Sequence, residues 1–422
     1  MAAGCLFPTF PGFNLDTVTP ADETQVADAV RDAAARGASF EILSGASMRT
    51  FGRPVEADAV LDLAKLSGIV SYEPDELILV VRAATPLADI EAELAEHRQM
   101  LAFAPADWGG LLGRDAGRAT LAGIVATNAC GARRVKAGAV RDHLIGCRFV
   151  NGASVAVKTG GRVVKNVTGF DIPKLVCGAH GTLGALTELT FRVVPAPPCA
   201  RALALQNCPP ADGLRALRQA AGLPVEATGL AYLPAWALAA IPIARNAGLG
   251  GGVGVALIRV EGTGAAVTDK LTMLRSELTG HDTSVLDDDR TALLFREIDC
   301  GGPFDGHGPF DGHDTDIWRL CVPVSDAQAA CEASEARAWY ADWAGGLLWL
   351  GLPATREIAD RLRGITARFG GHATLLRANA VARARLDVFE PEPAARAALT
   401  CAVKNAFDPA RLFNPGRMYQ EV

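Results

Sequence analysis

The fold of this chain is decided by one stretch, Gly161-Arg-Val-Val-Lys-Asn-Val-Thr-Gly-Phe-Asp-Ile-Pro-Lys-Leu-Val-Cys-Gly-Ala-His-Gly-Thr-Leu-Gly184. Its later glycines are Gly169, Gly178, Gly181 and Gly184. Each removes a Cβ where the chain must turn sharply or where a flat ligand must touch the backbone. A series of turns in a β-rich domain is the simpler interpretation. The clustering, together with the polar residues between 165 and 171, favours a cofactor-binding segment.

Size and composition limit the possible classes of protein. The 422 residues are enough for two domains, each with its own core. Half of the residues are hydrophobic and 21% are charged, which excludes disorder as the main state. The net charge of −6 provides no positive field for DNA or RNA, so we expect no nucleic-acid partner.

The sequence indicates neither export nor a transmembrane segment. Pro8 and Pro11 stand where the apolar core of a signal peptide would lie. The most apolar long region, residues 233–260, is interrupted by prolines, arginines and glycines, so it cannot form the roughly 20-residue helix that spans a bilayer. None of the ten cysteines shows C-x-x-C spacing, which disfavours metal and iron–sulfur sites. We expect free, buried thiols in a cytoplasmic protein.

The first part of the chain mixes helical and strand-like segments. Thr19-Pro20 and Gly37 predict the two ends of a helix. A strand at 40–43, a loop of small residues at 44–52 and a strand at 59–63 follow.

A second group of segments continues this pattern. A strand at 77–84 precedes a helix that begins at Thr85-Pro86. Asn151-Gly152 predicts a β-hairpin, and with it a β-meander over residues 144–164. A short helix should open at Asp171, and residues 185–194 should form the last strand.

A proline cluster at 195–198 marks the expected boundary between two domains. The predicted fold class is α+β, with a first domain at 1–195, an α+β second domain at 199–400 and a C-terminal tail at 401–422. Helices of the second domain are expected near 211–222, 264–279, 326–343 and 355–369, and strands near 253–260 and 317–323.

The usual nucleotide-binding motifs are missing. No G-x-G-x-x-G follows a strand, which disfavours a Rossmann site, and no G-x-x-x-x-G-K-[ST] phosphate loop occurs. The 44–52 loop offers another phosphate site, because consecutive amides of small residues, here 45–47, can converge on an anion. A second small-residue segment, 119–131, should open a helix at Thr120 whose first amides could contact another part of the ligand.

Several blocks of sequence resemble one family of flavoproteins. They are Ser44-Gly-Ala-Ser47 with Gly52-Arg-Pro54, Gly138-Ala-Val-Arg-Asp142, Gly161-Arg-Val-Val-Lys-Asn-Val-Thr-Gly-Phe-Asp171, Gly178-x-x-Gly-Thr-Leu-Gly184, Asp316-Ile-Trp-Arg-Leu320 and Phe407-Asp-Pro-Ala-Arg-Leu-Phe-Asn-Pro-Gly-Arg-Met418. Together they resemble the FAD-binding domain of the vanillyl-alcohol oxidase and p-cresol methylhydroxylase (PCMH) type and, within it, the FAD-binding subunits of bacterial glycolate oxidases. The resemblance covers essentially the whole chain. It implies a two-subdomain FAD-binding domain, a cap domain and a tail that returns toward the flavin.

The resemblance also implies how FAD is held. The pyrophosphate would lie on the 44–52 loop, 119–131 would add contacts, and adenine and isoalloxazine would lie against the backbone of 169–184. The first loop lacks the histidine that often carries covalent flavin in the family, so we expect non-covalent FAD. Ser44, Ala46 and Met48 replace part of the glycine run that is usual there. The predicted cofactor-binding residues are Ser44, Gly45, Ala46, Ser47, Met48, Gly52, Thr120, Leu121, Ala122, Gly123, Thr127, Asn128, Gly131, Arg141, Asp142, Gly169, Gly178, Gly181, Thr182, Gly184 and Asn414.

Substrate chemistry is less clearly indicated. Oxidation of a 2-hydroxy acid at a flavin needs a cation for the carboxylate and a base for the hydroxyl proton. Catalytic subunits of this family carry an H-x-x-H cluster in the second domain, and this chain has none. His307 and His313 end two copies of Gly-Pro-Phe-Asp-Gly-His, 302–307 and 308–313, which we expect to form an exposed loop. His372 is the candidate base, although a lone histidine is more often structural.

A cationic run lies beside the second cofactor segment and has two interpretations. Its members are Arg133, Arg134, Lys136 and Arg141. Runs of charge are usually solvated edges. The alternative is a contact with an anion or a partner near the flavin.

The leading functional hypothesis is the FAD-binding subunit of a glycolate oxidase complex, which converts the 2-hydroxy acid glycolate to glyoxylate. The resemblance implies a catalytic FAD subunit and an iron–sulfur subunit as partners. Such a subunit would be cytoplasmic and peripheral to the inner membrane through those partners. The alternatives are an autonomous FAD-dependent D-2-hydroxy-acid dehydrogenase and a scaffold that has lost FAD.

Overall fold

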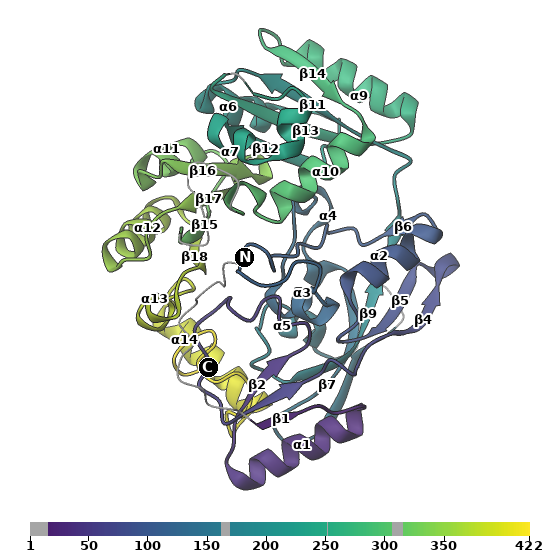
Figure 1. Cartoon of the computed structure of the whole chain (residues 1–422), viewed down its shortest axis with the longest axis vertical. Helices are drawn as coiled ribbons and strands as arrows, with labels where there is room; N and C mark the ends of the chain where they lie inside the picture. The colour runs from purple at the N-terminus through teal and green to yellow at the C-terminus, as the bar shows by residue number, and fades with distance from the viewer. Residues whose placement is uncertain (1–15, 162–168, 251, 306–314) are drawn as a thin grey trace, which may run out of the picture.

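The computed structural model describes residues 16–161, 169–250, 252–305 and 315–422 (Figure 1). The described part begins with a small parallel sheet of order β1-β3-β2. Helix α1 covers this sheet through Val26 and Val30, which share a core with Phe40 and Leu61. The elements are β1 (Asp16–Val18), α1 (Glu23–Arg36), β2 (Phe40–Leu43) and β3 (Ala59–Asp62).

A five-stranded antiparallel sheet of order β4-β5-β9-β7-β8 completes the first domain. The predicted Asn151-Gly152 hairpin is confirmed, since β7 and β8 pair directly. The third strand of the predicted meander, residues 162–164, lies outside the described residues, so the full meander stays a prediction. β9 lies between β5 and β7 and pairs with both. The strands of this sheet are β4 (Ile69–Glu73), β5 (Ile78–Arg82), β7 (Leu144–Val150), β8 (Ala156–Gly160) and β9 (Ala185–Arg192). Two short strands, β6 (Gln99–Met100) and β10 (Val194–Pro195), pair separately with each other.

Three helices of the first domain begin directly after a residue whose side chain caps their first turn. Thr120 caps α3 as predicted, because its hydroxyl accepts the Gly123 N–H, and Asp171 caps α5. The prediction of Thr19-Pro20 as the start of α1 is wrong. Asp22 is the N-cap, since its carboxylate accepts the Gln25 N–H at 2.8 Å. The remaining helices of this domain are α2 (Leu87–Glu96), α3 (Leu121–Thr127), α4 (Arg134–Ala137) and α5 (Ile172–Val176), with short 3₁₀ turns η1 (Pro74–Glu76) and η2 (Val140–Asp142).

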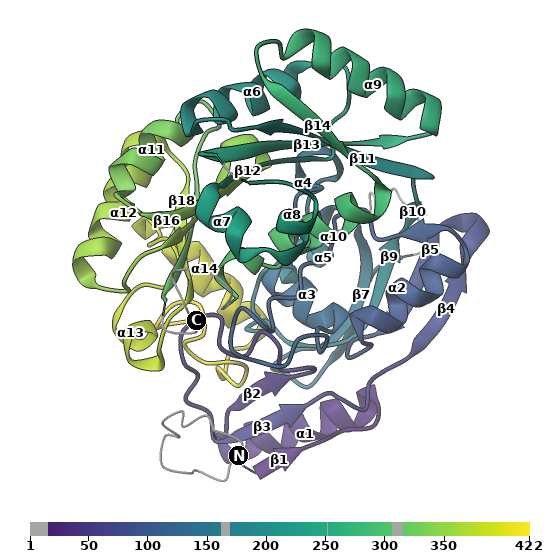
Figure 2. The same cartoon turned by 45° about the horizontal axis from the view of Figure 1, so that its top comes forward.

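The second domain is built on an antiparallel sheet of order β14-β11-β13-β12-β16-β17-β15-β18. Helices α6, α9, α11 and α12 cover its outer face, and α7, α8 and α10 lie between the sheet and the first domain (Figure 2). The strands are β11 (Cys199–Gln206), β12 (Gly229–Pro234), β13 (Gly254–Gly262), β14 (Asp282–Leu286), β15 (Ile317–Cys321), β16 (Ala338–Asp342), β17 (Leu347–Gly351) and β18 (His372–Arg377). The helices are α6 (Pro210–Gly222), α7 (Ala235–Ala240), α8 (Pro242–Asn246), α9 (Gly264–Glu277), α10 (Asp288–Asp299), α11 (Ala327–Ser334) and α12 (Arg356–Phe369), with η3 (Gly302–Phe304) and η4 (Trp343–Gly345).

Two predictions for the second domain are wrong. The helix expected over 326–343 ends at Ser334, because Glu335 adopts a left-handed conformation and the chain then enters β16. The first copy of the Gly-Pro-Phe-Asp-Gly-His repeat does not start as an exposed loop. Its Phe304 is 2% exposed and packs against Trp236 and Tyr340. Residues 306–314, with His307 and His313, lie outside the described residues.

The C-terminal segment returns to the first domain as expected (Figure 1). It contains α13 (Ala380–Arg385), α14 (Ala394–Phe407) and the tail that follows. Lys404 is completely buried, and its ammonium donates to Asp408 and to the Thr182 and Phe413 carbonyls at 2.7–3.0 Å. Phe413 in turn bridges to Phe40 of β2. A fully hydrogen-bonded buried ammonium therefore fixes the tail beside the first cofactor loop.

The cationic run after α3 joins the two domains. Arg133 pairs with Glu261 of β13, and Lys136 pairs with Glu226 at 2.5 Å. Arg134 lies over the Trp343 ring. Neither interpretation from the sequence fits Arg133 and Arg134, because the second domain supplies their partners, whereas Lys136 is exposed, as a solvated edge would be. Arg141 is exposed.

The described ranges contain free cysteines and lack a helix that could span a membrane. The cysteines there are free thiols, and most of them are buried, as predicted. None of the helices in these ranges is both long and apolar enough to cross a membrane.

Two buried carboxylates interact beneath the interface between the domains. Burial, and next the nearby Asp299, raise the pKa of Asp342 to about 8, although the Trp343 N–H and two arginines act in the opposite direction. Burial also raises the pKa of Asp299, to about 6, against the opposing effect of Arg259. Two adjacent buried carboxylates resist double ionisation, so the pair keeps one proton near neutral pH.

This acid pair predicts a pH-dependent stability. Folding raises the pKa of Asp342 from 3.8 to about 8, so its contribution to stability is full below about pH 4 and is lost as the pH rises to about 8. We expect Asp342→Asn, which keeps an acceptor for the Trp343 N–H, to show no such loss. The free energy of unfolding of the variant should therefore rise relative to that of the wild type by up to about 1.4 kcal/mol per pH unit over that range. Urea denaturation of both proteins across this range measures the difference. If the free energies of unfolding of the two proteins changed in parallel with pH, the raised pKa of Asp342 would be contradicted.

Candidate cofactor-binding site

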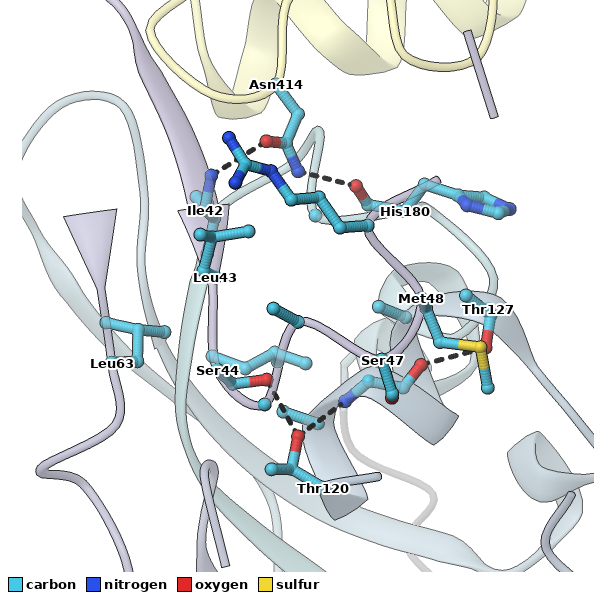
Figure 3. Close-up of a pocket in the computed structure, with 18 of the residues that line it drawn as sticks. Ile42, Leu43, Ser44, Ser47, Met48, Leu63, Thr120, Thr127, His180 and Asn414 are labelled. Carbon is cyan, nitrogen blue, oxygen red and sulfur yellow. Dashed lines mark hydrogen bonds between the residues drawn. The ribbon is translucent and has the colours of Figure 1, made fainter. Parts of the chain in front are cut away.

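A pocket opens in the first domain where the loop after β2 faces the start of α3 and the C-terminal tail (Figure 3). It has about 710 Å³ of empty space, its open mouth included. The lining residues are Ile42, Leu43, Ser44, Gly45, Ala46, Ser47, Met48, Arg49, Phe51, Leu63, Thr120, Ala122, Gly123, Ala126, Thr127, His180, Gly181, Gly184, Leu186, Asn414 and Arg417.

The loop after β2 keeps backbone donors available. The N–H groups of residues 45–48 donate to no acceptor in the described part of the chain, and all four residues line the pocket. Ala46 has a φ of 58°, and its carbonyl accepts the Arg49 N–H, so the loop turns tightly here. Consecutive free amides around a left-handed residue make a concave anion-binding nest. This loop can therefore donate several hydrogen bonds to one anionic group.

Close packing beneath the loop explains the glycine at position 45. A Cβ there would overlap the Arg118 carbonyl oxygen and lie 2.8 Å from the Thr120 methyl group. The Ser44 and Thr120 hydroxyls are also hydrogen-bonded at 2.7 Å. The loop is therefore pressed against the segment that leads into α3, and a larger residue at 45 must move it.

Two guanidinium groups give the pocket a positive lining. Arg49 and Arg417 share one carboxylate, that of Glu41, at 2.6 and 2.9 Å. Arg417 also donates to the Arg49 carbonyl at 2.7 Å. Burial lowers the pKa of Arg417, and Glu41 offsets part of this effect. Two cations against one carboxylate leave a net positive charge, which suits a phosphate-bearing ligand.

Asn414 joins three parts of the pocket wall. Its amide oxygen accepts the Ile42 N–H, and its amide nitrogen donates to the His180 carbonyl, both at 2.8 Å (Figure 3). A Cβ on Gly181, which has a φ of 71°, would lie 2.7 Å from the Asn414 amide nitrogen. The tail thus fixes the first loop relative to the glycine-rich third segment.

His180 is a neutral part of the lining. Its ring packs edge-on against Phe51 and Phe389. Burial lowers its pKa to about 3, and the charge of Arg417 acts in the same direction. The imidazole is therefore uncharged near neutral pH, and it is a poor proton acceptor there.

The start of α3 differs from expectation. The Leu121 and Ala122 N–H groups donate to the Thr85 and Ala83 carbonyls, and the Gly123 N–H donates to Thr120. The prediction that these first amides contact the ligand is wrong, because the segment after β5 and the N-cap already accept them. The helix instead presents Thr120, Ala122, Gly123, Ala126 and Thr127 as a small-residue wall of the pocket.

The structure brings part of the predicted set together. The predicted residues that line the pocket are Ser44, Gly45, Ala46, Ser47, Met48, Thr120, Ala122, Gly123, Thr127, Gly181, Gly184 and Asn414. Those outside its lining are Gly52, Leu121, Asn128, Gly131, Arg141, Asp142, Gly169, Gly178 and Thr182. Leu121 belongs to the buried core, and Asp142 is exposed. His372, the candidate base, is exposed at the first residue of β18 and does not line the pocket.

Some lining residues were not predicted from the sequence. They are Ile42, Leu43, Arg49, Phe51, Leu63, Ala126, His180, Leu186 and Arg417. Several of them lie within segments that were recognised, including Arg49 in the 44–52 loop, His180 beside Gly181 and Arg417 three residues after Asn414. An arginine or histidine inside a glycine-rich motif was therefore the signal that could have identified them.

Comparison with known proteins agrees with this geometry. The family model described as an FAD binding domain matches residues 16–160. The glycolate oxidase subunit GlcE of Escherichia coli (strain K12) is 31% identical over 383 residues, which cover 90% of this chain and 93% of that protein. The chain belongs to the GlcE family of glycolate oxidase subunits. It is thus a member of a family of FAD-dependent oxidoreductases.

Other matches of the GlcE family member are shorter or more distant. A D-lactate dehydrogenase of Anaerostipes hadrus is 36% identical over 138 residues, 33% of this chain and 27% of that protein. The crystal structure of p-cresol methylhydroxylase with substrate bound aligns with a TM-score of 0.69 and 16% identity, over 96% of this chain and 88% of that one. This likeness shows that the chain has the PCMH-type fold.

The Asn414 bridge predicts a coupled loss of stability and cofactor binding. Asn414→Ala leaves the Ile42 N–H and the His180 carbonyl without a partner, at about 1–3 kcal/mol for each buried group. We expect a lower melting temperature and weaker FAD binding, measured by thermal denaturation and by fluorescence titration. Asn246→Ala, at an exposed position, should change neither property. Unchanged FAD affinity in Asn414→Ala would show that the bridge does not shape the pocket.

Proposed function

We propose that this pocket binds FAD non-covalently and that the chain is the FAD-binding subunit of a complex that oxidises glycolate to glyoxylate. The observation that carries the proposal is the set of free amides at residues 45–48, beside two arginines. Backbone donors and guanidinium groups at one place are what a pyrophosphate requires. Membership of the GlcE family, over 90% of the chain, supports glycolate as the substrate of the complex.

The chain's own residues would hold and orient the cofactor. The amides of residues 45–48 would donate to the phosphate oxygens, and Arg49 and Arg417 would balance the negative charge. The small residues of α3 would let a flat or extended ligand lie against the helix. Of the predicted residues outside this lining, Gly169 and Gly178 would contact the rest of the FAD molecule. Bound FAD would supply a two-electron acceptor.

The ionisable side chains of the lining favour a role in holding electrons. They are Arg49, His180 and Arg417. None can abstract a proton near neutral pH, because the arginines are cations and the pKa of His180 is lowered to about 3. We therefore propose that a catalytic FAD subunit oxidises the hydroxy acid and that an iron–sulfur subunit accepts electrons. The complex would be cytoplasmic and attached to the inner membrane through these partners.

Two other functions remain as alternatives. The partial similarity to a D-lactate dehydrogenase favours an autonomous D-2-hydroxy-acid dehydrogenase, in which His372 would be the candidate base. The side chains of Ser44, Ala46 and Met48 in the first loop favour a scaffold without FAD. Absorbance and turnover of the purified chain separate the three. Colour without turnover of glycolate, and turnover once the partner subunits are added, supports the proposal. Turnover alone selects the dehydrogenase, and a colourless chain that FAD cannot restore selects the scaffold.

The nest predicts a sharp effect at Gly45. Gly45→Val forces the loop away from Arg118 and Thr120, so we expect the purified chain to lose its flavin absorbance while its far-UV circular dichroism is preserved. Gly364→Val is the matched control, because a Cβ at this position in α12 meets open space. The control should retain flavin. A Gly45→Val protein that keeps its flavin absorbance would contradict the role of this loop in FAD binding.

A further inference from the structure

Two side chains of the second domain form hydrogen bonds to one peptide unit of the first domain, one to its N–H and one to its carbonyl. The unit joins Gly131 to Ala132, in the segment that follows α3. Its N–H, on Ala132, donates to the Asp299 carboxylate at 2.6 Å. Its carbonyl, on Gly131, accepts the indole N–H of Trp343 at 3.2 Å. Both polar groups of this peptide therefore bond to side chains of the other domain, although the Gly131 carbonyl also accepts the Arg134 N–H at 3.1 Å.

Asp299 makes further contacts at the same place. Its carboxylate lies directly against the Gly131 Cα, so that a Cβ on Gly131 would overlap the carboxyl group. Its backbone carbonyl accepts the indole N–H of Trp108, a buried residue of the first domain, at 3.1 Å. Position 131 needs a glycine for this approach of a side chain from the second domain. A cofactor contact is not required to explain it.

The Gly131–Ala132 peptide is close in sequence to the wall of the pocket. Thr127, the last residue of α3, lines the pocket, and Asn128 ends the helix in a left-handed conformation. Gly131 then donates its own N–H to the Ala104 carbonyl at 2.8 Å. The segment between α3 and this peptide is thus short and held at both ends. Movement of the Gly131–Ala132 peptide would displace the end of α3.

We infer that Asp299 is a positioning residue, which together with Trp343 holds the Gly131–Ala132 peptide and thereby fixes the α3 wall of the flavin pocket. This inference rests on the proposed function, because it assigns a consequence for FAD binding. The second domain then contributes to cofactor affinity without lining the pocket. Asp299 acts through the backbone of the first domain.

The charge state of Asp299 agrees with this role. Burial raises its pKa to about 6, while Arg259, the Ala132 N–H and Arg133 act in the opposite direction. Above that pH the carboxylate is ionised, and an ionised acceptor forms a stronger hydrogen bond to a backbone N–H.

Substitution of Asp299 in the full-length chain tests the inference. We expect Asp299→Ala to weaken FAD binding about ten-fold, measured by fluorescence titration of the apoprotein. Asp299→Asn should retain most of the affinity, because its amide oxygen can still accept the Ala132 N–H. Leu274→Ala is the matched control for lost stability, since Leu274 is fully buried among the outer helices of the second domain. It should lower the melting temperature and leave FAD affinity unchanged.

A double-mutant cycle supplies a second readout. Gly131→Ala alone should weaken FAD binding, because its methyl group meets the Asp299 carboxylate. In the Asp299→Ala background the same change should have much less effect, since the space is then free. Additive effects in the cycle would overturn the inference.

The outcomes separate the inference from the proposal on which it rests. A wild-type chain that cannot bind FAD contradicts the proposed function, and the inference with it. A wild-type chain that binds FAD, alongside an Asp299→Ala variant of equal affinity, contradicts the inference alone. Equal losses of affinity in Asp299→Ala and Leu274→Ala would also overturn it, because they would indicate a general effect of stability.

Discussion

Four backbone N–H groups left without an acceptor are the constraint around which the rest of the site is arranged. Buried or partly buried amides are normally paired, because an unsatisfied donor costs free energy. Residues 45–48 nevertheless keep their amides free within the described chain. The tight turn at Ala46 and the packing of Gly45 against Arg118 hold them in this state. Such an arrangement is expected where a ligand supplies the acceptors.

The walls that surround these amides come from distant parts of the sequence. The tail contributes Asn414 and Arg417, and it is fixed by the buried Lys404–Asp408 pair. The second domain acts from farther away, through Asp299 and the peptide that it holds. Each of these contacts is polar and buried, so each depends strongly on a single partner. The site is therefore a property of the whole chain, although most of its lining belongs to the first domain.

Local signals allowed part of this site to be predicted from the sequence. The small residues of the first loop, the Thr120 cap and the Asn151-Gly152 hairpin depend on neighbours in sequence. What could not be predicted depends on contacts between distant residues. The amides of Leu121 and Ala122 donate to carbonyls of the segment after β5, and the requirement for glycine at position 131 comes from Asp299. The sequence carries no local trace of either contact.

Several strands of the second domain were missed for a related reason, although those near 253–260 and 317–323 were predicted. Strands such as β12 and β17 are buried on both faces of a sheet that has helices on one side and the first domain on the other. Their sequences are therefore continuously apolar and show no alternation, so they resemble buried helices. By contrast, the amphipathic outer helices α6 and α12 were predicted close to their observed bounds.

The most direct test of the central claim is a crystal structure of the chain with FAD bound. The account predicts that pyrophosphate oxygens lie within hydrogen-bonding distance of the amides of residues 45–48, with Arg49 and Arg417 beside them. A structure in which FAD binds elsewhere, with these amides still free or paired to protein carbonyls, would contradict it.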